Sequence, residues 1–246
     1  QDYTNAIRLN PLNQSYYEER GGSYGFLDQD WKAIDDFSQA IILGPETASL
    51  HDDLAHIYLI SMTDEYYESR YPYHQALEGI GRLDKALEHY TKAIELDPDN
   101  SDYYFKRGQS HHLIAEGVDK SDAVPAFRKA IEDLEQSILL DGGSSLIYPW
   151  LATAYTGVGE YDQAIRHFTT AIDKRGRCYS HCGDRGVLYA VTGQNKKAKS
   201  DFNDSYFDNR KFNYESERRF AKEYIGEGSN YCYGVSSEFW YILCPD

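Results

Sequence analysis

Residues 14–47 read QSYYEERGGSYGFLDQDWKAIDDFSQAIILGPET, and this stretch decides the fold class. Aromatic and small side chains recur in it at fixed places before a closing proline, and these places are held by Tyr17, Gly21, Tyr24, Ala33, Phe37, Ala40 and Pro45. Small side chains let two antiparallel helices approach closely, and the aromatic rings between them fill the remaining space. The stretch therefore predicts a helix hairpin in which these side chains serve packing rather than chemistry.

The same pattern returns further along the chain. Residues 145–178 carry it almost completely, through Tyr148, Leu151, Ala152, Tyr155, Ala164, Phe168 and Ala171. Residues 179–212 carry it more weakly, because Cys182 and Arg185 stand where the pattern has large apolar groups. The pattern resembles the tetratricopeptide repeat, a helix hairpin of about 34 residues. This resemblance implies an all-α fold, a right-handed α-solenoid of stacked hairpins.

Two middle repeats carry insertions. From Tyr58 to Ala86 the sequence runs 28 residues where the pattern has 9, and from His111 to Ala130 it runs 19 residues. Insertions of 19 and 10 residues bring all repeats into one register. The predicted organisation is the second helix of an incomplete repeat at 1–13, repeats at 14–47, 48–100, 101–144, 145–178 and 179–212, and a capping helix with an aromatic tail at 213–246.

The composition excludes several classes of protein. The 246 residues include 25 Lys and Arg against 40 Asp and Glu, and the resulting formal net charge of −15 repels nucleic acid and anionic membranes. No apolar run is long enough to span a membrane, so we expect a soluble protein without membrane insertion. The sequence leaves the compartment open between the cytoplasm and the outside of the cell.

The two ends suggest contacts beyond the repeats. Tyr3, Ala6 and Pro11 match the end of a second helix without its first helix, so either the chain is a piece of a longer array or this helix finds a partner in another molecule. The tail would form a sticky patch if exposed, through Phe239, Trp240, Tyr241, Ile242 and Leu243. It either folds over the last repeat as a lid or docks on a neighbouring copy, building rings or filaments.

The resemblance also implies a binding groove on the concave face, made by the first helices. Its predicted residues are Glu18, Asp52, His56, Asp102, Phe105, Gln109, His112 and Thr153. Family members that capture the C-terminal carboxylates of chaperones use Lys, Asn and Arg there, whereas this set contains no Lys or Arg. An acidic partner would meet like charge, so we expect a basic or neutral peptide. The alternative is that these charges only keep the protein soluble.

The insertion at 62–80 is the least generic part of the sequence. It places tyrosines around a basic residue: Tyr66, Tyr67, Arg70, Tyr71 and Tyr73. Exposed tyrosines offer a large contact area at a low cost in conformational entropy. The insertion is therefore either an interaction surface or a lengthened helix pair whose tyrosines pack on the adjoining repeat.

The sequence contains no catalytic or cofactor motif. It lacks the phosphate-binding loop G-x-x-x-x-G-K-[ST], the zinc-protease motif H-E-x-x-H and the nucleophile elbow G-x-S-x-G. We therefore predict no enzymatic activity and no cofactor. Two glycosylation sequons, at Asn13 and Asn203, would matter only outside the cell.

The four cysteines leave three alternatives open. Cys178, Cys182, Cys232 and Cys244 are either free thiols, disulfides or, with His181, part of a zinc site. Zinc is the least favoured, because the spacing matches no known finger, and we expect no metal. For disulfides, Cys232–Cys244 would tie down the tail and Cys178–Cys182 would staple a helix start.

The sequence thus predicts a non-enzymatic helical-repeat scaffold that binds other proteins. The first hypothesis is an assembly component that binds copies of itself through its terminal surfaces and the tyrosine insertion. The second is an adaptor that captures a basic or neutral peptide in the groove.

Overall fold

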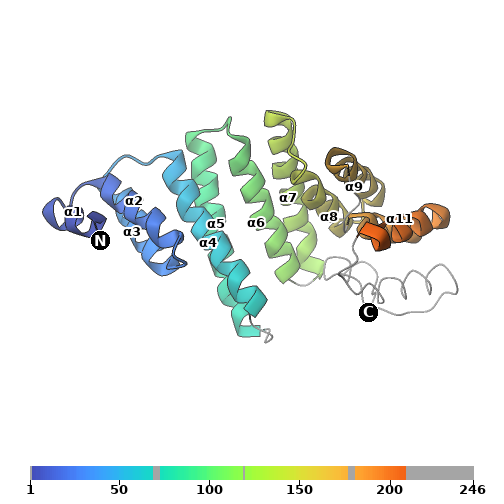
Figure 1. Ribbon diagram of the computed structural model, residues 1–246, viewed down its shortest axis with the longest axis horizontal. Coiled ribbons are helices and arrows are strands. Elements are labelled where there is room, and N and C mark those ends of the chain that lie inside the picture. Colours follow the sequence, from blue (N-terminus) through green and yellow to red (C-terminus); the bar gives the residue numbers. More distant parts are fainter. Residues whose placement is uncertain (1, 69–72, 119, 177–180, 209–246) are drawn as a thin grey trace. The chain divides into compact units, whose positions relative to one another are not determined.

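The computed structural model describes residues 2–68, 73–118, 120–176 and 181–208, and the side chains at 61–80, 120–121 and 202–208 lie outside that description. The described residues form eleven helices and no strand, which confirms the all-α prediction (Figure 1). The chain divides into two compact units, residues 1–117 and 118–246, and each is described on its own. The division falls between His111 and Ala130, where the sequence places an insertion.

Unit 1 consists of a short helix followed by two hairpins and a single helix. In order these are α1 (Asp2–Leu9), α2 (Gln14–Gly25), α3 (Asp30–Leu43), α4 (Ala48–Glu68), α5 (Tyr73–Leu96) and α6 (Ser101–Gly117). Helices α2 and α3 lie side by side, as do α4 and α5, and α6 packs on α5 (Figure 1). No side chain of α1 is buried, and the Tyr3 hydroxyl donates to Glu19 on α2 at 3.2 Å.

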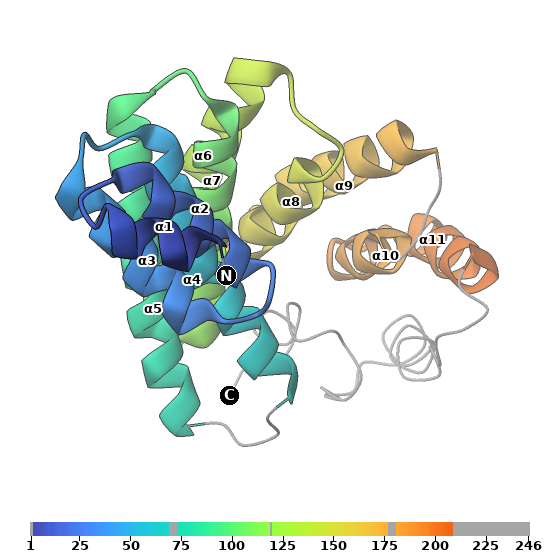
Figure 2. The same ribbon diagram turned by 60° about the vertical axis from the view of Figure 1, so that its left-hand side comes forward.

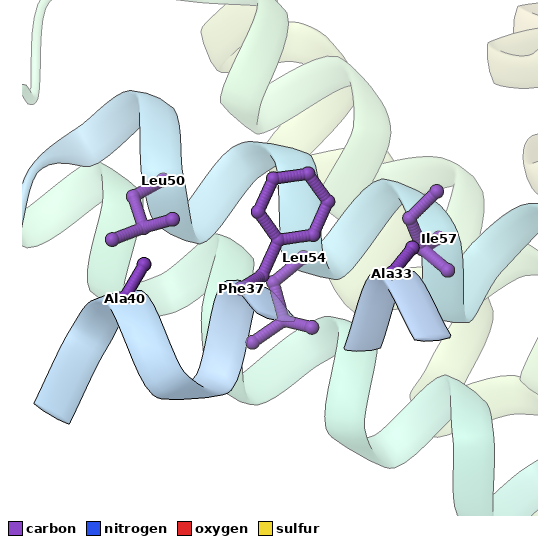
Figure 3. Close-up of a cluster of buried hydrophobic side chains, with 6 residues drawn as sticks. All are labelled: Ala33, Phe37, Ala40, Leu50, Leu54 and Ile57. Carbon is purple, nitrogen blue, oxygen red and sulfur yellow. The ribbon is translucent and has the colours of Figure 1, made fainter. Parts of the chain in front are cut away.

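A core of buried apolar side chains joins α3 to α4 (Figure 3). It is formed by Ala33, Phe37, Ala40, Leu50, Leu54 and Ile57. Two glycines let α2 approach this core: a Cβ atom at Gly21 would lie 3.1 Å from the Phe37 ring, and one at Gly25 would lie 2.8 Å from Ile57 Cδ1. Larger side chains at these places would push the helices apart.

The first insertion lengthens a helix pair. Helix α4 continues to Glu68 and α5 begins at Tyr73, so the hairpin extends well past the ends of α2 and α3 (Figure 1). Of the two interpretations, the lengthened helix pair is thus the one observed for the backbone. The packing of its tyrosine side chains lies outside the described residues, as do Arg70 and Tyr71 altogether.

Unit 2 consists of one long helix followed by two hairpins. Its helices are α7 (Lys120–Asp141), α8 (Ile147–Gly157), α9 (Tyr161–Arg175), α10 (His181–Val191) and α11 (Asn195–Asp208). Figure 2 shows the α8–α9 and α10–α11 pairs. Helix α8 lies against α7, and a Cβ atom at Gly157 would collide with the Phe127 ring. Gly176 ends α9 with φ +65°, a left-handed conformation that favours glycine.

The packing role of the small residues is confirmed in both units. All of the following alanines have an exposed fraction of 0%: Ala33, Ala40, Ala55, Ala86, Ala93, Ala130, Ala152, Ala164, Ala171 and Ala198. They stand at the places where the repeat pattern has a small residue, so the pattern marks the helix contacts correctly.

Other expectations concern residues outside the description. The capping helix, the aromatic tail from Phe239 to Leu243, Cys232 and Cys244 fall in 209–246, and the repeat boundaries stay predictions. Among the helices that the structure describes, none combines the length and apolar character needed to cross a membrane.

Candidate functional site

The candidate site is the surface of unit 1 made by α2, α4 and α6, which we call the first-helix face. Helix α4 contacts both α2 and α6, so the three helices form one continuous surface. Lys106 on α6 donates to both carboxylate oxygens of Asp52 on α4, each at 2.7 Å. Lys106 is not among the predicted groove residues, because it stands one place away from the predicted groove positions. The predicted acidic half of the groove is therefore partly neutralised.

Two other carboxylates on this face keep their negative charge unpaired. Glu18 on α2 and Asp53 on α4 have no ion-pair partner among the described residues. Desolvation raises the pKa of Asp53, the neighbouring Asp52 and Glu18 carboxylates raise it further, and Lys106 opposes them. A cation placed beside Asp53 would relieve this repulsion.

The remaining predicted groove residues of unit 1 lie in different settings. His56 is exposed on α4, and desolvation together with Lys106 lowers its pKa. Phe105 and Gln109 are half-buried on α6, while Asp102 is exposed in its first turn. These four residues are available at the surface, and Asp102 adds a further negative charge.

One predicted groove residue of unit 1 is not on the surface at all. His112 has an exposed fraction of 1%, and burial lowers its pKa to about 4. It is a neutral core residue, so its assignment to the groove was wrong. The sequence spacing alone could not distinguish His112 from the surface residues of α6. The burial of a helical residue depends on which turns of the helix the adjacent elements cover.

Thr153 belongs to unit 2 and serves its own helix. It is half-buried on α8, and its hydroxyl donates to the carbonyl oxygens of Pro149 and Trp150 at 3.1 and 2.9 Å. This hydroxyl donor is therefore already used within the helix.

An open cavity of unit 1 lies away from the first-helix face. It is an open depression of about 680 Å³ between the end of α3, the α3–α4 loop and α5. Its walls include Glu46, His51 and His89, together with the apolar side chains of Ile41 and Leu87. The sequence analysis did not anticipate this cavity.

A second feature missed from the sequence is a set of half-buried arginine side chains that each join neighbouring helices, which we call arginine clamps. Arg20 on α2 donates to both oxygens of Asp36 on α3 at 2.7 Å and to Thr4 on α1 at 3.3 Å. In unit 2, Arg185 on α10 donates to Asp201 on α11 at 2.7 and 2.8 Å and to Thr169 on α9 at 3.0 Å. Each clamp thus joins three helices.

A third arginine makes part of the same contact. Arg107 on α6 donates to Thr91 on α5 at 3.2 Å. All three arginines stand at the seventh place of a predicted repeat, with the threonine 16 residues before. This regular spacing is the signal that could have revealed them, and it explains why Arg185 departs from the apolar pattern.

The other two repeats use a different contact at the same places. Leu54 and Leu151 stand where the clamps have arginine, and His89 and His167 stand where the clamps have aspartate. His89 stacks on Tyr58 with ring centroids 6.0 Å apart, and His167 stacks on Tyr155 at 5.3 Å. The predicted repeats therefore alternate between an arginine clamp and a stacked histidine.

Cys182, one of the cysteines considered for a zinc site, is oxidised. Cys182 has an exposed fraction of 1% and is disulfide-bonded, to a cysteine outside the described residues. A disulfide sulfur is not the thiolate that zinc requires. His181 instead lies 3.1 Å from an Arg175 nitrogen and 3.8 Å from Asp184, and no group of three metal-binding side chains occurs among the described residues.

Comparison with known proteins identifies the repeats. Residues 80–114 match the TPR repeat family and residues 151–178 match the tetratricopeptide repeat family. The crystal structure of YrrB, described as a TPR protein with an unusual peptide-binding site, is 14% identical, has a TM-score of 0.67 and covers 91% of this chain and 98% of that one. A MamA structure is 20% identical, with a TM-score of 0.63, and covers 80% and 92%. The chain thus contains tetratricopeptide repeats, in residues 80–114 and 151–178.

Two curated relatives share these repeats. The mitochondrial import receptor subunit TOM70 of Homo sapiens is 26% identical over 195 residues, which cover 70% of this chain and 31% of the relative. The small glutamine-rich tetratricopeptide repeat-containing protein 2 of Mycosarcoma maydis is 31% identical over 98 residues, which cover 40% and 22%. The chain therefore spans about a third or less of the curated relatives it matches.

Proposed function

We propose that the chain is a non-enzymatic adaptor whose first-helix face in unit 1 binds a basic or neutral peptide segment of another protein. The observation that carries this proposal is the unpaired negative charge of Glu18 and Asp53 on a face where Asp52 is already neutralised by Lys106. A basic side chain would lower the energy of these carboxylates, whereas an acidic one would add to the repulsion.

The relatives support a role in binding proteins. One is an import receptor subunit and one structural neighbour is described as having a peptide-binding site. Neither description specifies the sequence that this chain would bind. The charge of the first-helix face supplies the expected preference, and its half-buried Phe105 supplies an apolar contact.

The preference can be measured with three fluorescent peptides of equal length, one basic, one neutral and one acidic. We expect anisotropy to show the tightest binding for the basic peptide and none for the acidic one. The double variant Glu18→Gln/Asp53→Asn should weaken basic-peptide binding about two- to thirtyfold, because exposed charge pairs contribute about 0.2–1 kcal/mol each.

The matched control is Asp99→Asn, which removes one negative charge from the exposed α5–α6 connection. It should leave the affinity unchanged at moderate salt, since it lies off the first-helix face. A loss of binding free energy in the control half as large as that in the double variant would reduce the effect to net charge. Preference for the acidic peptide would contradict the proposal.

A second candidate function, assembly with copies of itself, is favoured by exposed apolar side chains in unit 1. Around the α2–α3 turn, the exposed fraction is 94% for Phe26, 64% for Leu27 and 66% for Trp31. Near the end of α1 it is 79% for Leu9 and 75% for Leu12. Light scattering should then detect oligomers that are lost in the double variant Phe26→Ser/Trp31→Ser. A monodisperse monomer at high concentration would exclude this candidate.

A further inference from the structure

Three side chains from three segments of unit 1 meet at the wall of the open cavity. His51 near the start of α4 lies with its Nδ1 atom 2.9 Å from Nδ1 of His89 on α5. On its other side, His51 Nε2 lies 3.4 Å from a carboxylate oxygen of Glu46 in the α3–α4 loop. The His51 side chain has an exposed fraction of only 6%, so its polar atoms depend on these two partners.

The arrangement fixes where the hydrogens lie. Only one hydrogen can stand between the two Nδ1 atoms. Since the Glu46 carboxylate can only accept, His51 carries its hydrogen on Nε2 and presents a bare Nδ1 to His89. His89 must then donate from its own Nδ1. The result is a directed chain from His89 through His51 to Glu46, which leaves His89 Nε2 as an acceptor.

Two successive protons act differently on this chain. The first can bind to His89 Nε2 and leaves every hydrogen bond in place. The second has to bind to His51 Nδ1, where it removes the acceptor of the His89 hydrogen bond and sets two cations 2.9 Å apart. We propose that the His89–His51–Glu46 chain is a proton-sensitive joint, which holds the start of α4 against α5 at neutral pH and releases it in acid.

The surrounding charges do not remove this sensitivity. Burial lowers the pKa of His89, and the His51 ring and Lys85 lower it further, while Glu88 and Glu46 act in the opposite direction. Glu88 is bound to Lys85 at 2.7 Å, and Lys92 lies 3.2 Å from Glu95 and 3.9 Å from Glu46. Asp84 is a further carboxylate in the cavity wall, and Ile41 lines the same cavity from α3. Tyr58 on α4 stacks on His89.

Unit 2 contains the same contact without the second imidazole. His167 on α9 stacks between Tyr148 and Tyr155 of α8, with ring centroids 6.2 and 5.3 Å away. Tyr148 stands at the place in its repeat that His51 holds in the other. The pair His167 and Tyr148 is therefore an internal control, because it can take up one proton but contains no hydrogen bond between two imidazoles.

The proposed joint is a property beyond peptide binding, and it does not depend on the proposed peptide binding.

The test uses the full chain and hydrogen exchange followed by mass spectrometry at pH 7.5 and 5.5, corrected for the intrinsic pH effect. We expect exchange in residues 48–58 and 83–96 to speed up about tenfold or more in acid. His51→Tyr, which copies the unit 2 arrangement, should reduce this acceleration to the smaller one expected of the α8–α9 hairpin. His167→Phe should leave the acceleration in these two segments unchanged.

The outcomes are decisive in either direction. Equal acceleration in wild type and His51→Tyr would overturn the proposal, as would no acceleration in wild type. Should His51→Tyr fail to fold, NMR titration of the wild-type imidazoles replaces it. Coupled two-step titration of His51 and His89 would support the joint, and independent single-step titration of both would refute it.

Discussion

The arginine-clamped hairpin α10–α11 and the histidine-stacked hairpin α8–α9 solve one packing problem with opposite chemistry. In the first, Arg185 and Asp201 are an ion pair with side chains 15 and 7% exposed. In the second, Leu151 is buried and His167 stacks between tyrosines. Both hairpins place alanines with an exposed fraction of 0% at the helix crossing, Ala164 in one and Ala198 in the other. The small residues therefore set the distance between the helices. We expect that the arginine and aspartate can be replaced by leucine and histidine only together.

The largest effect should come from breaking one clamp. Arg185→Leu leaves the Asp201 carboxylate buried without its cation, which should lower the free energy of unfolding by about 3–5 kcal/mol in urea titrations followed by circular dichroism. The double variant Arg185→Leu/Asp201→His installs the other kind of contact beside Tyr189. It should regain at least half of the loss, and a double variant as unstable as the single one would show that the two contacts are not equivalent.

Glycine substitutions should show a smaller difference, between a contact that joins α7 to α8 and a contact within the α2–α3 hairpin. Gly157→Ala forces a methyl group into the Phe127 ring and should cost about 1–3 kcal/mol of stability. Gly21→Ala, in the clamped hairpin of unit 1, meets the Phe37 ring at 3.1 Å. We expect it to be near neutral, because the helix propensity of alanine offsets the mild crowding by about 1 kcal/mol. The same urea titration checks both, and an equal cost would remove this distinction.

The smallest effect concerns pH. Burial lowers the pKa of His167 below its ordinary value of 6.5, so the unfolded chain binds this proton more tightly than the folded one. The associated stability is complete above pH 6.5 and is lost as the pH falls below it. His167→Phe should flatten the pH dependence of the unfolding free energy between pH 7 and 5. A slope identical to that of wild type would contradict this assignment.

Much of the fold follows from the sequence because helix contacts repeat locally. Ala33, Ala86, Ala164 and Ala198 mark helix crossings within single hairpins, and a fixed spacing finds them all. The arginine clamps were within reach of the same method, since Arg20 and Arg185 each stand 16 residues from both a threonine and an aspartate.

The site was predicted less well, because its contacts join residues that are far apart. Lys106 reaches Asp52 across 54 residues, and the intervening insertion hides the relation in the sequence. His51 and His89 are 38 residues apart and meet only when α4 lies on α5. His112 looks like a surface residue by spacing but is enclosed by the fold. The periodic spacing of small and aromatic residues predicts where helices cross. It does not predict which polar groups meet in a pocket.

The alternation of clamp and stack has a consequence for engineering. Arg185 needs Thr169 on the helix before it, whereas Tyr155 donates to Glu135 on the helix before its own. Removing the single hairpin α8–α9 would place the Arg185 guanidinium, which donates to a threonine hydroxyl, against the surface of α7 that now contacts the Tyr155 phenol. Hairpins should therefore be excised, grafted or duplicated two at a time, which makes the natural module of this chain a doublet.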